Sequence, residues 1–255
     1  MANLNSVILI RANQQRNNAL IGIALLFVTM MSEAAISLDR TRIIFNSADT
    51  SASVMLQNKS ETLPYLVQSW LENSAGQKVD SPLSALPAIQ RIDVGQKSQV
   101  RIISLPDIEQ LAADRETLFY FNMREIPPKS DITAAVQIAI QNKIKLFYRP
   151  AAIKADYKNV WQEQLQIRQQ GERLKIHNPT PYYVTLGHLN RDNRGNFPGF
   201  DSVMIAPFGT ESVKTPGYNG NHYSLGYMDD FGQMIIRSVN CSIGHCRIQA
   251  VEKKI

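Results

Sequence analysis

Residues 134–150 read Ala-Ala-Val-Gln-Ile-Ala-Ile-Gln-Asn-Lys-Ile-Lys-Leu-Phe-Tyr-Arg-Pro, and this stretch is the strongest indicator of the fold. Its apolar side chains recur at every second position or at multiples of two, at Val136, Ile138, Ile140, Ile144 and Leu146. That period predicts one long strand over residues 134–148 with a single apolar face. Two lysines, Lys143 and Lys145, lie within it, and Arg149-Pro150 ends it. Such a strand can pair with the open sheet of another protein and hold an anion at its end.

Six segments before this stretch also read as strands, because they are rich in β-branched and aromatic residues or alternate between apolar and polar ones. They are residues 36–45, 51–57, 63–71, 88–93, 99–104 and 118–126. Turn clusters separate them, and helical periodicity is scarce, with one short helical turn expected at residues 106–113. Seven strands within about 115 residues predict an immunoglobulin-like β-sandwich.

The strand pattern then breaks at residues 151–156, which read as a linker. A second strand series follows at residues 165–169, 173–178, 182–189, 202–205, 223–227, 233–240 and 245–251. The chain is therefore predicted to be all-β, with one immunoglobulin-like domain at residues 35–150 and a second, less regular one at residues 157–255.

Residues 1–34 are predicted to be a signal peptide. Arg11 and Arg16 make its start positive, and residues 19–31 form an apolar run of 13 residues. That run is shorter than the roughly 20 residues of a membrane span. Ser32-Glu33-Ala34 then offers small residues at the two positions that a signal peptidase reads. We expect cleavage after Ala34, which leaves 221 residues and lowers the net charge from +5 to +4.

The composition argues against several classes of function. The charge is mild and forms no block of five or six like residues, so a nucleic-acid surface is not indicated. The four histidines show no metal-ligand spacing, so we expect no metal site. The sequence has no phosphate-binding glycine loop followed by lysine and no nucleophile-elbow serine motif, so we expect no nucleotide, no cofactor and no enzyme activity.

Two cysteines, Cys241 and Cys246, are separated by four residues near the C-terminus. In an exported protein, which meets an oxidising compartment, this spacing predicts a disulfide across a hairpin. The loop that it closes is short, so its contribution to stability should lie near the low end of about 2–4 kcal/mol. A redox-active pair is the alternative, although such pairs commonly have two intervening residues.

Several long stretches resemble a known family. Residues 35–45 read Ala-Ile-Ser-Leu-Asp-Arg-Thr-Arg-Ile-Ile-Phe, and residues 111–127 read Leu-Ala-Ala-Asp-Arg-Glu-Thr-Leu-Phe-Tyr-Phe-Asn-Met-Arg-Glu-Ile-Pro. Together with residues 143–153, 160–162 and 178–184, they resemble the PapD-like periplasmic chaperones of the chaperone–usher pilus pathway. The resemblance spans almost all of the chain after residue 34. It implies two immunoglobulin-like domains in a bent, L-shaped arrangement.

The resemblance implies that Arg42 and Lys145 lie in the cleft between the domains and bind the C-terminal carboxylate of a pilin subunit. Two fixed cations suit this task because a carboxylate offers two oxygens, and each charge-assisted hydrogen bond contributes about 1.5–3 kcal/mol. Without the resemblance, both residues would read as ordinary solvated charges at strand ends. Arg40 and Lys143 lie two residues away and are weaker candidates.

The resemblance also implies that Val136, Ile138 and Ile140 form a donor strand, which fills the groove of a pilin that lacks its own last strand. The alternative is that these side chains face the core of their own domain, as alternate apolar residues commonly do. The period leaves the face open, because Lys145 falls on the opposite side of an unbroken strand from Ile140. A bulge between them would change that relation.

A third implied feature is an ion network between the domains, formed by Glu116, Arg149 and Asp230, with Asp229 as the competing third member. Such a network would set the angle between the domains, and three independent surface charges are the alternative. Leu86-Pro87 aligns with a loop proline that is cis in the family. Ala88 follows it here in place of a second proline, which leaves the isomer open.

The resulting hypothesis is a periplasmic, ATP-independent chaperone that captures pilin subunits, lends them the strand at residues 134–141 and delivers them to an outer-membrane usher. It leaves open whether the free chaperone caps that strand by forming a dimer. One alternative is a structural pilin or adhesin, although a pilin should carry a donor extension before its first strand. A periplasmic thiol enzyme that uses Cys241 and Cys246 is another.

Overall fold

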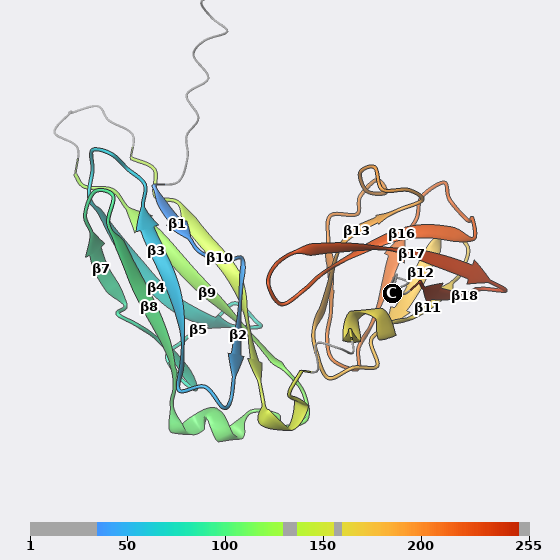
Figure 1. Ribbon diagram of the computed structural model, residues 1–255, viewed down its shortest axis with the longest axis horizontal. Coiled ribbons are helices and arrows are strands. Elements are labelled where there is room, and N and C mark those ends of the chain that lie inside the picture. The colour runs from blue at the N-terminus through green and yellow to red at the C-terminus, as the bar shows by residue number, and fades with distance from the viewer. Residues whose placement is uncertain (1–34, 130–136, 156–159, 250–255) are drawn as a thin grey trace, which may run out of the picture. The chain divides into compact units, whose positions relative to one another are not determined.

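The computed structural model of the chain describes residues 35–129, 137–155 and 160–249 (Figure 1). Strands dominate these residues, and their helical segments are short 3-10 turns. Two separate clusters of buried apolar side chains form, one drawn from residues 36–148 and the other from residues 161–246. The predicted all-β fold with two immunoglobulin-like domains is confirmed, whereas the predicted signal peptide lies outside the described residues.

The first domain is a sandwich of two sheets. One sheet has the order β1-β3-β8-β6, where β1 is Ile36–Leu38, β3 is Ser51–Asn58, β8 is Lys97–Ser104 and β6 is Leu83–Leu86. The other has the order β2-β10-β9-β4-β5, where β2 is Arg42–Asn46, β10 is Gln141–Arg149, β9 is Thr117–Ile126, β4 is Tyr65–Asn73 and β5 is Lys78–Val79. A further strand, β7 at Ile89–Ile92, pairs with β4.

Alternation along β9 shows what holds the two sheets together. Phe119, Phe121 and Met123 are buried in the core of the first domain, whereas Tyr120 is half-buried and Arg124, which follows Met123, is exposed. Burying a large apolar side chain fully contributes about 1.5–3 kcal/mol. The strand period therefore fixes one face of this sheet to the core and leaves its other face available for the site.

The single strand predicted over residues 36–45 is instead two strands in two different sheets. β1 pairs with β3, and β2 pairs in parallel with β10, so the chain crosses between sheets at residues 39–41. The carboxylate of Asp39 accepts a hydrogen bond from the backbone N–H of Met55 (3.1 Å) and pairs with Arg40 (2.7 Å). These contacts stabilise the crossing, which places Arg42 at the beginning of β2.

The strand predicted over residues 134–148 is shorter than its apolar period indicates. β10 begins at Gln141, residues 137–140 form no strand, and Val136 lies outside the described residues. The partner strand explains this limit, because β9 ends at Ile126 and two prolines follow it. The backbone N–H of Glu125 donates to the carbonyl of Ile140 (3.0 Å), one residue before β10 begins. Proline lacks the N–H that would continue this ladder.

Three short strands are not predicted by the sequence patterns: β5, β6 and β15, the last at Thr210–Lys214. β6 lies between Pro82 and Pro87, and prolines so close to a short segment obscure a strand pattern. Both prolines follow cis peptide bonds, which answers the question that the sequence leaves open for Leu86-Pro87. The expected helical turn is the 3-10 helix η1 at Pro106–Gln110.

The strands of the second domain form one hydrogen-bonded series, in the order β14-β13-β16-β17-β18-β11-β12-β15. Besides β15, these are β11 at Gln166–Gln169, β12 at Arg173–His177, β13 at Val184–Asn190, β14 at Val203–Ile205, β16 at His222–Met228, β17 at Met234–Ser242 and β18 at His245–Ile248. Because β18 pairs with both β17 and β11, it joins the strands β14-β13-β16-β17 to the strands β11-β12-β15.

Cys241 and Cys246 are direct partners across the hairpin of β17 and β18 and form the predicted disulfide. Short 3-10 helices, η2 at Ala151–Ile153 and η3 at Trp161–Gln164, flank the start of the second domain. Within the described residues, no helix has the length and apolar character of a membrane span.

Candidate functional site

Arg42 and Lys145 are brought together by the parallel pairing of β2 with β10, in which they are direct register partners. On β10, Leu146 and Tyr148 belong to the core, so Lys145 and Phe147 project from the other face of the sheet. Arg42 precedes the buried Ile43 on β2 and lies on that same outer face. Both cationic side chains are half-buried.

Neither cation has a carboxylate partner among the described residues. The Nε of Arg42 is buried without a hydrogen-bond acceptor. The Nζ of Lys145 donates to the hydroxyl of Thr185 on β13, over 3.3 Å. Burial lowers the pKa of Arg42, and burial together with the neighbouring Arg42 lowers the pKa of Lys145. Two partly desolvated cations side by side leave a site that favours an anion with at least two acceptor oxygens.

The two weaker candidates have partners of their own. Arg40 pairs with Asp39 (2.7 Å), and Lys143 pairs with Glu72 (2.6 Å) while lying over the ring of Tyr120. Their charges are thus neutralised locally, unlike those of Arg42 and Lys145. No group of three or more histidine, cysteine or acidic residues within the described part of the chain could hold a metal ion.

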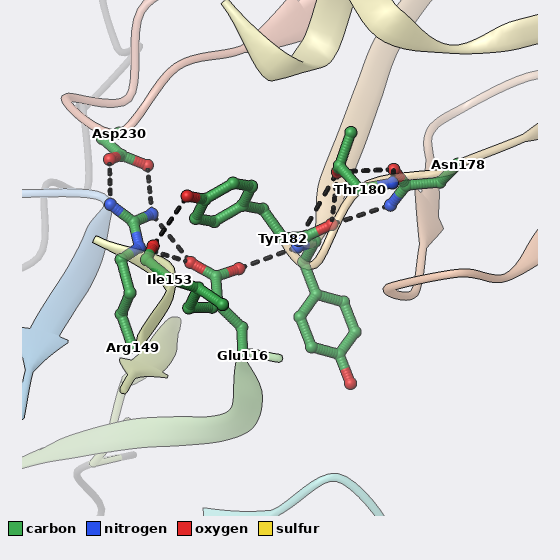
Figure 2. A network of polar contacts seen from close by, with 8 residues as sticks. Glu116, Arg149, Ile153, Asn178, Thr180, Tyr182 and Asp230 are labelled. Atoms are coloured by element: carbon green, nitrogen blue, oxygen red, sulfur yellow. Dashed lines mark hydrogen bonds and ion pairs between the residues drawn. The ribbon is translucent and has the colours of Figure 1, made fainter. Parts of the chain in front are cut away.

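Glu116, Arg149 and Asp230 meet in one network, shown in Figure 2. The Nε and Nη2 of Arg149 donate to Oε1 of Glu116 over 2.9 and 2.7 Å. Its Nη1 and Nη2 donate to the two carboxylate oxygens of Asp230 over 2.8 and 3.1 Å. Because Arg149 is only 2% exposed, this guanidinium is a buried charge held between two carboxylates.

The second domain meets this network through residues 178–183. The backbone N–H of Tyr183 donates to Oε2 of Glu116 over 2.7 Å, and the rings of Trp161 and Tyr182 lie about 5 Å from the guanidinium of Arg149. Asn178, fully buried, holds the turn that presents Tyr182 and Tyr183, because its Nδ2 donates to the carbonyl of Tyr182 over 2.7 Å (Figure 2).

Burial raises the pKa of Glu116 to about 7, against the opposing effect of Arg149 and of the hydrogen bonds that the carboxylate accepts. The pKa of Arg149 is raised: its burial acts to lower it, but its hydrogen bonds and charge contacts with Asp230 and Glu116 outweigh that effect. The guanidinium is therefore the permanent charge of this network, and Glu116 is its titratable member.

Asp230 and its neighbour Asp229 have different roles in the turn between β16 and β17. Oδ1 of Asp229 accepts the backbone N–H groups of Phe231 (2.9 Å) and Gln233 (2.8 Å), so this carboxylate caps its own turn. Gly232 takes the left-handed conformation (φ 84°) that closes the turn. Asp230 is thereby directed at Arg149, and of the two aspartates it is the one in the network.

Of the donor-strand candidates, the structure describes Ile138 and Ile140. Ile138 is 69% exposed and outside the core of its own domain. The register of β10 with β9 runs without a shift from Gln141 to Tyr148, so no bulge separates Ile140 from Lys145 in the strand itself. Lys145 and the apolar series that includes Ile144 and Leu146 therefore use different faces.

Four residues of the site lie beyond what the sequence patterns indicate: Thr185, Tyr183, Tyr182 and Trp161. Each belongs to the second domain and acts on a residue of the first, so no local pattern signals the contact. The family motif at residues 178–184 contains Tyr182 and Tyr183 and ends next to Thr185. It indicates a turn there, but not which residues of the first domain these three contact.

Family models match both domains. Residues 35–154 match the pili and flagellar-assembly chaperone model, PapD N-terminal domain, and residues 160–237 match the pili assembly chaperone PapD, C-terminal domain. The chain belongs to the PapD-like family of pilus-assembly chaperones, and it is a chaperone rather than a structural pilus subunit.

Particular relatives agree with this class. The chain is 48% identical to the uncharacterized fimbrial chaperone YbgP of Escherichia coli K12 over 90% of its length and 96% of the relative. It is 43% identical to the chaperone protein PapD of Escherichia coli, over 88% of this chain and 94% of PapD. Among solved structures, the Salmonella enterica SafA pilin in complex with the SafB chaperone is matched with 26% identity and a TM-score of 0.71, over 83% of this chain and 98% of the matched one.

Proposed function

We propose that this chaperone acts in the periplasm, without ATP, by binding the C-terminal carboxylate of a pilin subunit at Arg42 and Lys145. The observation that carries the proposal is the pair of half-buried cations in direct register with no carboxylate partner among the described residues. A carboxylate with two oxygens would complete both, with charge-assisted hydrogen bonds worth about 1.5–3 kcal/mol each.

The segment before β10 is the proposed donor strand. Ile138 is exposed, and Ile140 is the point at which backbone pairing with β9 stops. A subunit that lacks a strand would pair with this segment through main-chain hydrogen bonds and take Val136, Ile138 and Ile140 into its groove. The solved SafA–SafB complex, in which a chaperone binds a pilin, supports pilin subunits as the partners of this chain.

The remaining steps follow from this chemistry. A donor segment that completes the subunit must be exchanged for another strand when the subunit joins the fibre, and delivery to an outer-membrane usher would provide the place for that exchange. We propose a signal peptide at residues 1–34 as the route of export, and a disulfide between Cys241 and Cys246 suits an oxidising compartment.

Co-purification of a co-expressed pilin from the periplasm tests the carboxylate anchor. Lys145→Ala should lose the pilin or leave it degraded, while Lys143→Ala, which removes a neutralised lysine two residues away, should retain it. If both variants bring down as much pilin as the unmodified chaperone, the carboxylate is not held by Lys145. If the unmodified chaperone brings down no pilin, that subunit is not a client.

A further inference from the structure

Glu125, near the end of β9, is a buried carboxylate whose charge no described cation neutralises. It is 3% exposed, and none of the ion pairs among the described residues includes it. Its Oε2 accepts the backbone N–H of Ile36 over 2.7 Å. A buried carboxylate whose one donor among the described residues is a neutral N–H is costly to ionise, so this arrangement favours a cation close by.

The start of β1 offers the place for that cation. Ile36 is fully buried, and the carbonyl of Ala35 accepts the backbone N–H of Lys59 over 2.7 Å, so the first two described residues are held firmly. Consecutive backbone nitrogens lie at most about 3.7 Å apart. The backbone nitrogen of Ala35 therefore lies within about 6.5 Å of the Glu125 carboxylate, a range in which opposite charges still attract.

We propose that Glu125 is a binding site for the α-ammonium group of Ala35, which cleavage after Ala34 creates. The inference rests on the export and cleavage proposed above. In the uncleaved chain the nitrogen of Ala35 belongs to a neutral amide, whereas after cleavage it carries a positive charge. Removal of the signal peptide would thus give this buried carboxylate, which pairs with no cation among the described residues, an ion-pair partner.

The position of Glu125 connects this pair to the donor segment. The backbone N–H of Glu125 donates to the carbonyl of Ile140, where the segment leaves the sheet. The side chain of the same residue holds β1 through Ile36. Pairing with the new N-terminus would therefore fasten the corner of the domain from which the donor segment extends.

A double-mutant cycle, measured on four forms of the protein, tests the proposal. The mature chain beginning at Ala35 is compared with a chain that carries Gly-Ser-Gly before Ala35, each with Glu125 or with Glu125→Gln. Glutamine keeps an oxygen for the N–H of Ile36 but removes the charge. In urea, the extension should raise the unfolding equilibrium constant about tenfold when Glu125 is present and leave it unchanged in the Glu125→Gln background.

Exposed Glu61 provides the matched control, because Glu61→Gln removes a carboxylate at the surface and should leave the tenfold effect intact. The pairing raises the pKa of the α-amino group above its ordinary value of about 7.7–8. The stability difference should therefore be full below about pH 7.7 and disappear as the pH rises through the raised pKa.

Equal effects of the extension in the Glu125 and Glu125→Gln backgrounds would overturn the proposal. So would an intact mass of the periplasmic protein that places its start elsewhere than Ala35, since no ammonium group would then stand beside Ile36. Both readouts are independent of pilin binding. Failure of the carboxylate anchor at Lys145 would therefore leave this result unchanged, and the converse also holds.

Discussion

Strand β10 carries two cationic sites on one face, and they differ in how their charge is balanced. Arg149, at its end, makes four hydrogen bonds to the carboxylates of Glu116 and Asp230 and is almost fully buried. Lys145, four residues earlier, stands beside Arg42 and donates to the neutral hydroxyl of Thr185. The first site is neutralised by carboxylates of the chain itself, and the second has no carboxylate partner among the residues that the structure describes.

Under the proposed function, this difference separates a structural charge from a binding charge. A buried charge that is already paired costs free energy when its partner is removed, whereas an unpaired one costs free energy until a ligand arrives. The two sites should therefore respond in opposite ways to the loss of a cation. Removal at Arg149 should damage folding, and removal at Arg42 or Lys145 should damage binding.

The largest expected effect is that of Arg149→Ala. It leaves the buried Glu116 and the partly buried Asp230 without their shared cation, so the free energy of unfolding should fall by about 3–5 kcal/mol. Urea denaturation followed by tryptophan fluorescence measures the change, with Arg115→Ala, which removes an exposed pair with Asp114, as the control. A loss below about 1 kcal/mol would place Arg149 among ordinary surface charges.

The next effect is on binding. Lys145→Met and Arg42→Met should each weaken the capture of a pilin by about 1.5–3 kcal/mol, which is roughly 10- to 150-fold in the dissociation constant. Both variants should unfold at a urea concentration no lower than the unmodified protein, because each removes a desolvated charge. If either variant destabilises the fold as strongly as Arg149→Ala, the distinction between the two sites is wrong.

A smaller effect comes from the titration of Glu116. Burial raises its pKa to about 7 from 4.5, so the folded chain keeps this proton over a range in which the unfolded chain has lost it. The stability from this group is full below about pH 4.5 and declines as the pH rises to about 7. Glu116→Gln should flatten that decline in urea midpoints measured from pH 4.5 to 7.5. An unchanged slope would assign the pH dependence to other groups.

The smallest effect is expected for Lys143→Ala. Lys143 is 41% exposed and pairs with Glu72 on the outer face of the sheet, so its loss should cost about 0–1 kcal/mol of stability. The capture of pilin should be unaffected. A decrease in capture comparable with that of Lys145→Met would extend the anion site to a cation that has a partner of its own.

Local patterns in the sequence predict most of the strands of this fold, but not where strands begin or which strands pair. The two-residue period identifies the core face of β10, and the family resemblance singles out Arg42, Lys145, Glu116 and Arg149, with Asp230 or Asp229 as the last member. The crossing between sheets at residues 39–41 and the start of β10 at Gln141 are not predicted. Both depend on which distant strand offers hydrogen bonds, and a local period carries no information about that partner.

The same reason explains the residues of the second domain that sequence reasoning misses. The hydroxyl of Thr185 accepts a hydrogen bond from Lys145, which is 40 residues away in the sequence. The backbone N–H of Tyr183 donates to Glu116, which is 67 residues away. Neither residue type is unusual in a strand. Only the packing of β13 and its preceding turn against β10 and Glu116 brings these groups into hydrogen-bond distance.

The parallel pairing of β2 with β10 joins the second strand of the first domain in sequence to its last. Arg42 and Lys145 therefore become neighbours after all the strands between them have taken their places. A partly translocated or half-folded chain has the two cations but not the site. Under the proposed function, the chaperone would hold a client only when its own folding is finished, which would give it a built-in test of its own completion.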